Sequence, residues 1–291
     1  MIKRVFIVLL VLFVFIPLQS NIDAQTNAAV PSYKIVIDNK ELKLSTPPFQ
    51  HNGTTMVPFR PVFNQLGLDV EWDPVHHQVV GKNSEVTITL TIGSVYAKVN
   101  DAAEVMPLAP VLRNGTTYIP LRFVGTASGA DVEFYGESLN VVWIISAKQD
   151  QLLSAVIRKN VAEVKRLLES GADPTIMVGP EGSAIYHFID DSLDIVKLFL
   201  ENGMDINYYA EDYSYSRTLL QIAAADGQVE IVKFLLDAGA DPLIITGTNW
   251  TALEVAEYWR GRVEAGYQNM DPSRTPSVES YDEIIELLRK R

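Results

Sequence analysis

The sequence contains no cysteine and only four histidines in 291 residues. The absence of cysteine excludes disulfide bridges, thiolate metal sites and cysteine nucleophiles. Basic residues are also scarce: 24 lysines and arginines face 36 acidic residues, which gives a formal net charge of −12. A chain this acidic repels a phosphate backbone, so nucleic acid is not an expected partner.

Long apolar runs are equally scarce, and the single one stands at the N-terminus. Lys3 and Arg4 precede an apolar run at 5–16, and Pro17 and a polar stretch follow it. This order is typical of a secretory signal peptide, and the run is too short for the roughly 20 residues that span a bilayer. We expect cleavage after Ala24 and an exported chain without a membrane span. An uncleaved N-terminal anchor is the alternative.

A segment of 21 residues occurs twice in the first half of the chain. NGTTMVPFRPVFNQLGLDVEW (52–72) returns 62 residues later as NGTTYIPLRFVGTASGADVEF (114–134), and 11 positions are identical. In each copy Asn-Gly favours a tight hairpin turn, and proline stops the following β-prone run. A short helix (60–66 or 122–128), a terminal glycine and an alternating strand complete the pattern. The sequence predicts that residues 30–146 form an α+β domain of two internal repeats, with antiparallel strands and short helices.

The doubled NGTTxxPxR, followed by G(L/A)DVE and an aromatic residue, resembles the copper amine oxidase N-terminal-like domain of exported Gram-positive bacterial proteins. The resemblance covers residues 33–145. It implies a domain over residues 25–147 that positions or attaches the protein at the cell surface.

The resemblance does not imply catalysis. In copper amine oxidases the redox chemistry belongs to a separate domain, which has a self-processed tyrosine in an Asn-Tyr-Asp/Glu context and three histidine ligands. Here Asn207-Tyr208 is followed by Tyr209, and the histidines are His51, His76, His77 and His187. We therefore expect no enzyme, no catalytic residues, no metal and no cofactor.

A second repeat occupies the C-terminal half. GADP occurs at 171–174 and 239–242, and a looser GMDIN at 203–207. Before each turn, apolar residues spaced i, i+3, i+4 predict an amphipathic helix. Glycine is expected to end each helix, aspartate to bond the local backbone, and proline to prevent the helix from resuming. Thr218 and Thr251 are expected to cap the upstream helices.

A period near 33 residues with these motifs resembles the ankyrin repeat. The resemblance implies an α-helical solenoid of about four repeats over residues 150–291. Its first repeat lacks a leading hairpin, and its fourth carries an insertion at about 260–280. Only residues 146–150 join the last strand to the first helix. We expect the N-terminal domain to cap the solenoid and to dock against Leu152, Leu153 and Val156.

The loop at 208–215 is the candidate protein-binding site, because four of its eight residues are tyrosines. It lies in the 36-residue interval between Gly203 and Gly239, which is longer than the usual repeat of about 33 residues, so the tip is expected to protrude. The alternative is that some rings fold back onto neighbouring repeats. The candidate residues are Tyr208, Tyr209, Glu211, Asp212, Tyr213 and Tyr215.

Charge indicates the kind of partner. Residues 150–291 hold 13 basic and 24 acidic side chains, a net of −11. This excess favours a basic protein surface as the partner, although solubility alone would also account for it.

Two further patterns favour structural roles. Neighbouring side chains on a strand point to opposite faces, so His76 and His77 are expected in an exposed turn or strand end rather than a metal site. Arg60 and Arg122 follow the proline of each copy. We expect them to bind backbone carbonyls or a carboxylate such as Glu71 or Glu133, and the alternative is that they anchor a ligand.

Together these patterns predict an exported, non-enzymatic protein-binding or adaptor protein, secreted or associated with the cell surface or cell wall. Two alternatives stay open. One is a cell-wall or polysaccharide-binding protein acting through residues 30–146, and the other is a copper-dependent accessory protein.

Overall fold

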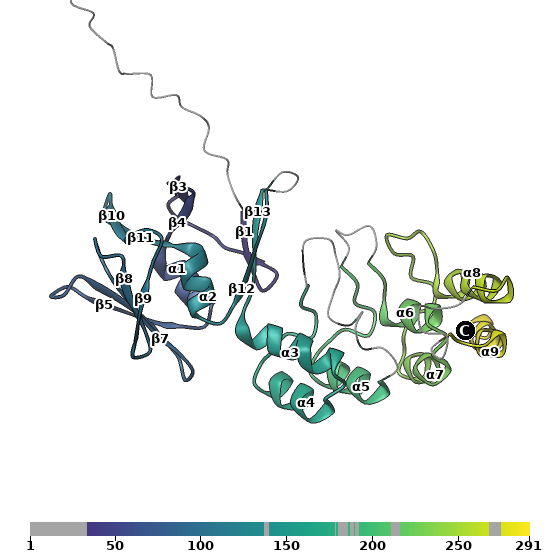
Figure 1. The fold of residues 1–291 in the computed structure, drawn as a ribbon. Helices are drawn as coiled ribbons and strands as arrows, with labels where there is room; N and C mark the ends of the chain where they lie inside the picture. The colour runs from purple at the N-terminus through teal and green to yellow at the C-terminus, as the bar shows by residue number, and fades with distance from the viewer. Residues whose placement is uncertain are drawn as a thin grey trace, which may run out of the picture. The chain divides into compact units, whose positions relative to one another are not determined.

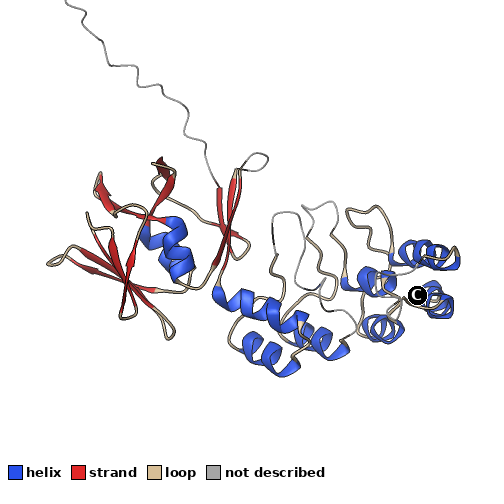
Figure 2. Ribbon diagram, viewed as in Figure 1, coloured by secondary structure: helices blue, strands red, loops and turns tan. Residues whose placement is uncertain are grey.

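The computed structural model describes residues 34–136, 140–177, 179, 186, 189, 192–210, 216–267 and 275–291 (Figure 1). The predicted signal peptide, residues 1–24, lies outside the described residues. Strands dominate up to residue 145 and helices follow it (Figure 2). No helix in the described parts is long and apolar enough to cross a membrane.

The β-rich part consists of short strands and two short helices. The helices are α1 (Phe59–Gln65) and α2 (Leu121–Ala127). The strands are β1 (Lys34–Ile37), β2 (Lys40–Glu41), β3 (Phe49–His51), β4 (Thr54–Pro58), β5 (Asp69–Asp73), β6 (Gln78–Lys82), β7 (Thr87–Thr91), β8 (Tyr96–Val99), β9 (Ala102–Val105), β10 (Val111–Arg113), β11 (Thr116–Pro120), β12 (Asp131–Tyr135) and β13 (Val141–Ile145).

Within the described residues these strands form sheets of order β12-β13-β1-β2, β10-β11-β4-β3 and β5-β6-β7-β8-β9. The described pairs are antiparallel except β1 with β13, which run parallel with Ile35 opposite Val142. The prediction of antiparallel strands is therefore wrong for this pair. Parallel strands need a long connection, and here the rest of the β-rich part lies between the two.

Both Asn-Gly pairs form the predicted tight turns. The φ angles are 48° and 75° at Asn52 and Gly53, and 50° and 76° at Asn114 and Gly115. Positive φ at both central residues matches the right-handed twist of the flanking strands. The two hairpins then join edge to edge, because β4 pairs with β11 with Val57 opposite Ile119.

Glycine ends both short helices as predicted. Gly67 and Gly129 have φ of 73° and 81°. After α1, the N–H of Leu68 donates to the Phe63 carbonyl at 2.9 Å, and after α2 the N–H of Ala130 donates to the Gly125 carbonyl at 3.0 Å. These bonds satisfy carbonyls that a helix end would otherwise leave unpaired.

Strand β13 is buried on both faces and divides its side chains between two cores. Val142 and Ile144 belong to the core of the β-rich part. Val141, Trp143 and Ile145 belong instead to the core of the helical part. Because successive side chains of a strand point to opposite faces, the apolar run VVWII supplies both cores at once.

The helical part is built from short amphipathic helices. They are α3 (Ala147–Ile157), α4 (Val161–Glu169), α5 (Leu193–Glu201), α6 (Leu219–Ala225), α7 (Val229–Asp237), α8 (Ala252–Glu264) and α9 (Val278–Arg289). Helix α8 extends through 260–264, so the predicted insertion begins as helix, and residues 268–274 lie outside the described residues.

The local signals of the second repeat act as predicted. Gly171, Gly203 and Gly239 have φ of 87°, 90° and 97° after their helices. The aspartate that follows each turn accepts the N–H two residues on, as Asp241 Oδ1 does from Leu243 at 2.8 Å. Thr218 caps α6 and forms a capping box with Gln221.

The predicted five-residue connection between the two parts is wrong. Helix α3 begins at Ala147, so Ser146 alone separates it from β13. Ser146 has the extended backbone of an N-cap residue, and one such residue is sufficient to connect the end of a strand to the start of a helix. The predicted docking is confirmed: Leu152 and Val156 share one core with β13, and Leu153 packs against it.

The turn between β1 and β2 also bonds to the first loop of the solenoid. Asn39 Nδ2 donates to the Thr175 carbonyl at 3.1 Å, and Asn39 Oδ1 accepts the Met177 N–H at 2.9 Å. Later in the solenoid, Asn207 Oδ1 accepts the Asp241 N–H at 2.9 Å. Asn39 of the β1–β2 turn therefore bonds to the backbone of the first repeat. Asn207 of one ankyrin turn bonds to the backbone of the next turn in the same way.

Asp38 lies at this junction, where a polar cleft separates the β-rich part from α3. Its Oδ1 accepts the Ser146 N–H at 2.8 Å. Burial raises the pKa of Asp38, and nearby Asp173 adds to the rise, while the Ser146 bond and Lys40 oppose it. A raised folded-state pKa means that the folded chain binds this proton more tightly than the unfolded chain, so ionisation of Asp38 destabilises the fold.

Asp38→Asn should therefore raise the melting temperature at pH 7.5, because it keeps an acceptor for Ser146 and removes the buried charge. The gain should shrink as the pH falls through the folded-state pKa of Asp38 and both forms become neutral. Thermal unfolding of both proteins between pH 7.5 and 3.5 measures this. Asparagine also tolerates the positive φ of 47° here, but that benefit is independent of pH. A gain that stays constant across the range would contradict the role assigned to the charge.

Candidate functional site

Of the predicted tyrosine loop (208–215), the structure describes residues 208–210. Glu211, Asp212, Tyr213 and Tyr215 lie outside the described residues. Tyr208 is half-buried, packs against the solenoid core and meets the ring of buried Tyr186 edge-on at 5.8 Å. Tyr209 is half-buried as well. Tyr208 thus contributes to packing, and the binding role of the loop stays a prediction.

Ala210 and Ser216, the described residues on either side of 211–215, bond to each other. Ser216 Oγ accepts the Ala210 N–H at 2.6 Å, although these residues are six apart in sequence. Burial raises the pKa of Tyr186, whose ring meets Tyr208, to about 12. Tyr208 is therefore anchored on the solenoid core, and Ala210 and Ser216 are held close together.

The next turn, at 239–250, presents apolar side chains to solvent. Leu243 is 72% exposed and Ile245 is 58% exposed, while Thr246 of the same turn is buried. Exposed and half-buried positions alternate here, because Ile244 between Leu243 and Ile245 is half-buried. Isolated exposed apolar residues are common, but two on one ordered turn indicate a contact surface.

Buried Gln221 on α6 holds this turn in place. Its Nε2 donates to the carbonyls of Ile244 at 3.1 Å and Trp250 at 2.7 Å. Its Oε1 accepts the N–H of Thr218 and the hydroxyl of Thr246, each at 3.0 Å. One amide thus bonds to the middle and to the C-terminal end of the turn, which restrains Leu243 and Ile245 on either side of Ile244.

A run of aromatic side chains leads from Trp250, at the end of this turn, onto α8. The ring centroids of Trp250 and Tyr258 are 4.9 Å apart, those of Tyr258 and Trp259 5.5 Å, and those of Trp259 and Tyr267 5.5 Å. The guanidinium of Arg262 lies 5.0 Å from the Tyr267 ring centroid. Tyr258 and Tyr267 are exposed. Rigid aromatic side chains with a polar end are typical of contact surfaces. We refer to Leu243, Ile245, Trp250, Tyr258, Trp259 and Tyr267 as the apolar surface.

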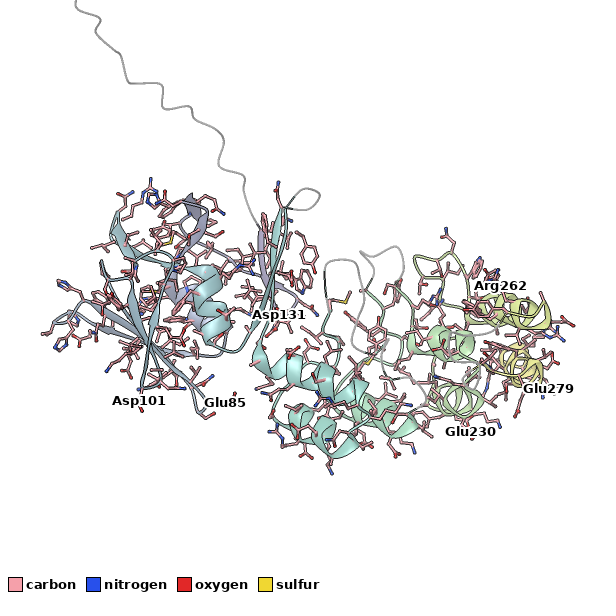
Figure 3. All side chains as sticks on the ribbon, viewed as in Figure 1. Glu85, Asp101, Asp131, Glu230, Arg262 and Glu279 are labelled. Atoms are coloured by element: carbon pink, nitrogen blue, oxygen red, sulfur yellow. The ribbon has the colours of Figure 1, made fainter. Side chains whose placement is uncertain are left out.

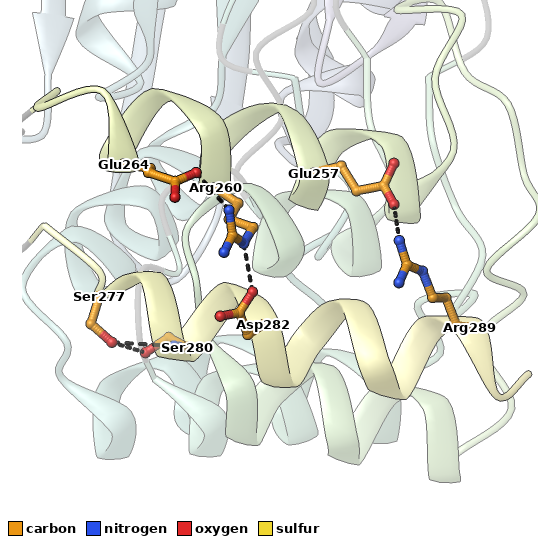
Figure 4. A network of polar contacts seen from close by, with 7 residues as sticks. All are labelled: Glu257, Arg260, Glu264, Ser277, Ser280, Asp282 and Arg289. Carbon is orange, nitrogen blue, oxygen red and sulfur yellow. Dashed lines mark hydrogen bonds and ion pairs between the residues drawn. The ribbon is translucent and has the colours of Figure 1, made fainter.

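Helix α9 lies alongside α8 and is joined to it by ion pairs (Figure 4). Arg260 bonds to Asp282 at 2.5 Å and to Glu264 at 2.7 Å, and Arg289 bonds to Glu257 at 2.7 Å. The Arg260 guanidinium lowers the pKa of Asp282. These pairs are exposed and contribute little stability individually.

The firmer anchor of α9 is Tyr281. Its buried hydroxyl donates to the Ala225 carbonyl of α6 at 2.7 Å, and burial raises the pKa of Tyr281 far above its usual range.

Charge at this end of the chain is mixed but mainly acidic. Figure 3 labels Glu230, Arg262 and Glu279, which lie on α7, α8 and α9. Lys233 of α7 pairs with Glu283 at 2.7 Å. The excess of carboxylates over residues 150–291 nevertheless gives this part a net charge of −11.

The structure assigns local roles to the other candidates. His76 stands in the exposed turn between β5 and β6, as predicted, with its Nδ1 2.6 Å from Asp73 Oδ2. The bond from His76 lowers the pKa of Asp73 to about 2. His187 lies outside the described residues. Among the side chains that the structure describes, no three or more of histidine, aspartate and glutamate gather closely enough to hold a metal ion.

The two repeated arginines differ. Arg122 Nη1 donates to the Val132 carbonyl at 2.6 Å, which confirms the predicted bond to the backbone. Arg60 instead lies over the ring of Phe59, with 5.0 Å between the guanidinium carbon and the ring centroid.

The apolar surface is the part of the candidate site that sequence reasoning missed. The signal was present as the apolar triplet Leu243-Ile244-Ile245 directly after GADP, where a polar loop is usual. It was obscured because such a triplet is equally compatible with burial.

Comparison with known proteins assigns both halves of the chain. Residues 36–143 match the family model of the copper amine oxidase N-terminal domain. Residues 152–246 match that of ankyrin repeats, in three copies.

Three curated relatives illustrate the similarity. A candidate E3 ubiquitin-protein ligase of Arabidopsis thaliana, XBAT34, is 33% identical over 43% of this chain and 32% of its own length. A candidate ankyrin repeat protein, R598, of Acanthamoeba polyphaga mimivirus is 34% identical over 31% of this chain and 26% of its own length. The ankyrin repeat and KH domain-containing protein mask-1 of Caenorhabditis elegans is 27% identical over 33% of this chain and 4% of its own length.

This chain spans a third or less of the length of each of these relatives. The ankyrin repeats and the relatives that contain them point to a non-enzymatic module for protein–protein interaction. The chain carries a copper amine oxidase N-terminal domain followed by ankyrin repeats.

Proposed function

We propose that this is an exported, non-enzymatic adaptor whose ankyrin array binds a partner protein through the apolar surface. The supporting observation is the exposure of Leu243 and Ile245 on a turn that buried Gln221 holds rigidly. A surface ordered before binding loses little conformational entropy when the partner docks. Exposed apolar and aromatic groups on such a surface gain free energy when a partner removes them from water.

The partner is proposed to carry basic residues around an apolar contact. The net charge of −11 over residues 150–291 supports this, because charge complementarity raises the rate of encounter and disfavours acidic competitors. Tyr209, Tyr213 and Tyr215 of the preceding loop would extend the contact to the neighbouring repeat.

The N-terminal domain is proposed to position the array at the cell surface or cell wall after export. The charged and apolar order of residues 1–24 supports export. We also infer that the domain contains two copies of one unit. The same order of hairpin, helix and strand around the two Asn-Gly turns supports this interpretation.

The test is affinity capture from the surface and culture fractions of the producing cell, with the full chain as bait. The double variant Leu243→Ser/Ile245→Ser should retain a specific partner at least about 10-fold less well, since each buried aliphatic side chain is worth about 1.5–3 kcal/mol. Leu112→Ser is the matched control, because Leu112 is also an exposed leucine but belongs to β10.

Retention that falls equally in the control and the double variant would argue against this surface. Loss of retention on Tyr209→Ala alone would assign binding to the tyrosine loop instead. Circular dichroism of each variant should match that of the wild type, because all four replaced side chains lie wholly or partly at the surface.

A further inference from the structure

A cavity of about 300 Å³ opens in the β-rich part, remote in sequence from the apolar surface. It lies among β4, α2, β12 and β13. Its lining residues are Gln50, Gly53, Thr54, Thr55, Pro107, Pro120, Leu121, Arg122, Phe123, Val132, Phe134 and Val142. Ligand cavities in proteins begin at about this volume, so the occupant must be small.

One wall of the cavity is aromatic and is held in position by the backbone. Phe134 lines the cavity and is 44% exposed. Its ring lies so close to Gly136 that a Cβ at that glycine would be 2.5 Å from the ring. Phe123 of α2 supplies a second ring. A flat apolar body can therefore contact both phenylalanines.

Arg122 is the one charged residue among the described residues that line the cavity. Its bond to the Val132 carbonyl uses Nη1, and a guanidinium carries five N–H donors in all. Val132 and Phe134 both line the cavity, so Glu133 between them points to the other face of β12. The charge facing a ligand in this cavity is therefore positive.

The polar groups at the mouth are neutral. Gln50 Nε2 donates to Thr55 Oγ1 at 2.6 Å across the β3–β4 hairpin, and Thr54 stands beside them. These groups can bond to an amide or a hydroxyl but do not compete with Arg122 for a negative charge.

We propose that this cavity binds a carboxylate attached to a small aromatic or apolar body. The carboxylate pairs with Arg122, and the body lies against Phe123 and Phe134. Two sources share this chemistry: the C-terminal residue of a peptide and a free arylalkanoic acid. A guanidinium recognises a carboxylate with two parallel hydrogen bonds, which makes the charge and the geometry selective together.

The test measures binding of four probes to the full chain by isothermal titration calorimetry. The acids are 3-phenylpropionate and N-acetyl-alanyl-phenylalanine, and the neutral counterparts are their primary amides. Each acid should bind at least about 10-fold more tightly than its amide, as expected for hydrogen bonds to a charged group. Tighter binding of the dipeptide than of 3-phenylpropionate would identify a chain terminus as the source, and equal binding would identify a free acid.

Single substitutions test which residues cause the preference for acid over amide. Arg122→Gln should abolish the preference for acid over amide. Arg60→Gln is the matched control, because Arg60 holds the same place in the first copy of the motif, is exposed and does not line the cavity. Phe134→Ala keeps Arg122 and should weaken acid and amide alike.

Acids that bind the wild type no more tightly than their amides would overturn the proposal. So would equal effects of Arg60→Gln and Arg122→Gln. Arg122→Gln could fail to fold because its bond to Val132 is lost. In that case Phe134→Ala tests the proposal, which is overturned if Phe134→Ala binds the probes as tightly as the wild type does. Leu243→Ser/Ile245→Ser should bind all four probes as the wild type does, which separates this site from the proposed protein-binding function.

Discussion

Replacement of Trp143 by alanine should lower the free energy of unfolding by about 3–5 kcal/mol, the usual cost of removing a large buried aromatic side chain. The loss should fall first on the helical part, because Trp143 packs in the core that contains Leu152, Val156 and Val164. Hydrogen exchange followed by mass spectrometry should show faster exchange in α3 and α4 than in α1 and α2.

Ile144, the next residue of β13, packs in the other core. Ile144→Ala should cost about 2–5 kcal/mol, but exchange should rise first in the β-rich part, because Ile144 packs in that core. Trp143→Phe is a conservative control, since it keeps an aromatic ring and removes the buried indole N–H, for which the described residues provide no hydrogen-bond partner. Identical exchange patterns for Trp143→Ala and Ile144→Ala would contradict the division of β13 between two cores.

Replacement of Gln221 by alanine should lower the free energy of unfolding by about 3 kcal/mol, since each buried polar group left unpaired costs about 1–3 kcal/mol. The side chain bonds to Thr218, Thr246 and the carbonyls of Ile244 and Trp250, and some of these groups can recover bonds to water. Urea denaturation measures the loss.

The same variant should weaken capture of the partner even though Gln221 is buried, because the turn that presents Leu243 and Ile245 loses its support. Gln151→Ala on the exposed side of α3 is the matched control and should change stability by less than about 0.5 kcal/mol. Full stability together with undiminished capture in Gln221→Ala would contradict the supporting role given to this residue.

Local signals predicted the turns and helix ends well. Asn-Gly at 52–53 and 114–115 adopts positive φ, and Gly67, Gly129, Gly171 and Gly239 end their helices in the left-handed region. Such features depend on the conformations that a few adjacent residues can reach, so a short stretch of sequence is enough to specify them.

The candidate site was less predictable. The tyrosine content of 208–215 indicated a surface loop, yet Tyr208 packs against Tyr186 and the solenoid core. The exposure of Leu243 and Ile245 depends on Gln221, which precedes them by more than twenty residues and bonds to the turn only in the folded chain.

The sequence by itself determined the turn chemistry and the amphipathic helices, because each follows from residues close together along the chain. Only the tertiary structure decided how the two parts meet. Strand β1 pairs in parallel with β13, Ser146 alone joins β13 to α3, and Asn39 holds the first turn of the solenoid. Apart from the connection at Ser146, these contacts link residues about 100 or more positions apart in the chain. An apolar run such as VVWII also reads the same in sequence whether its side chains enter one core or two.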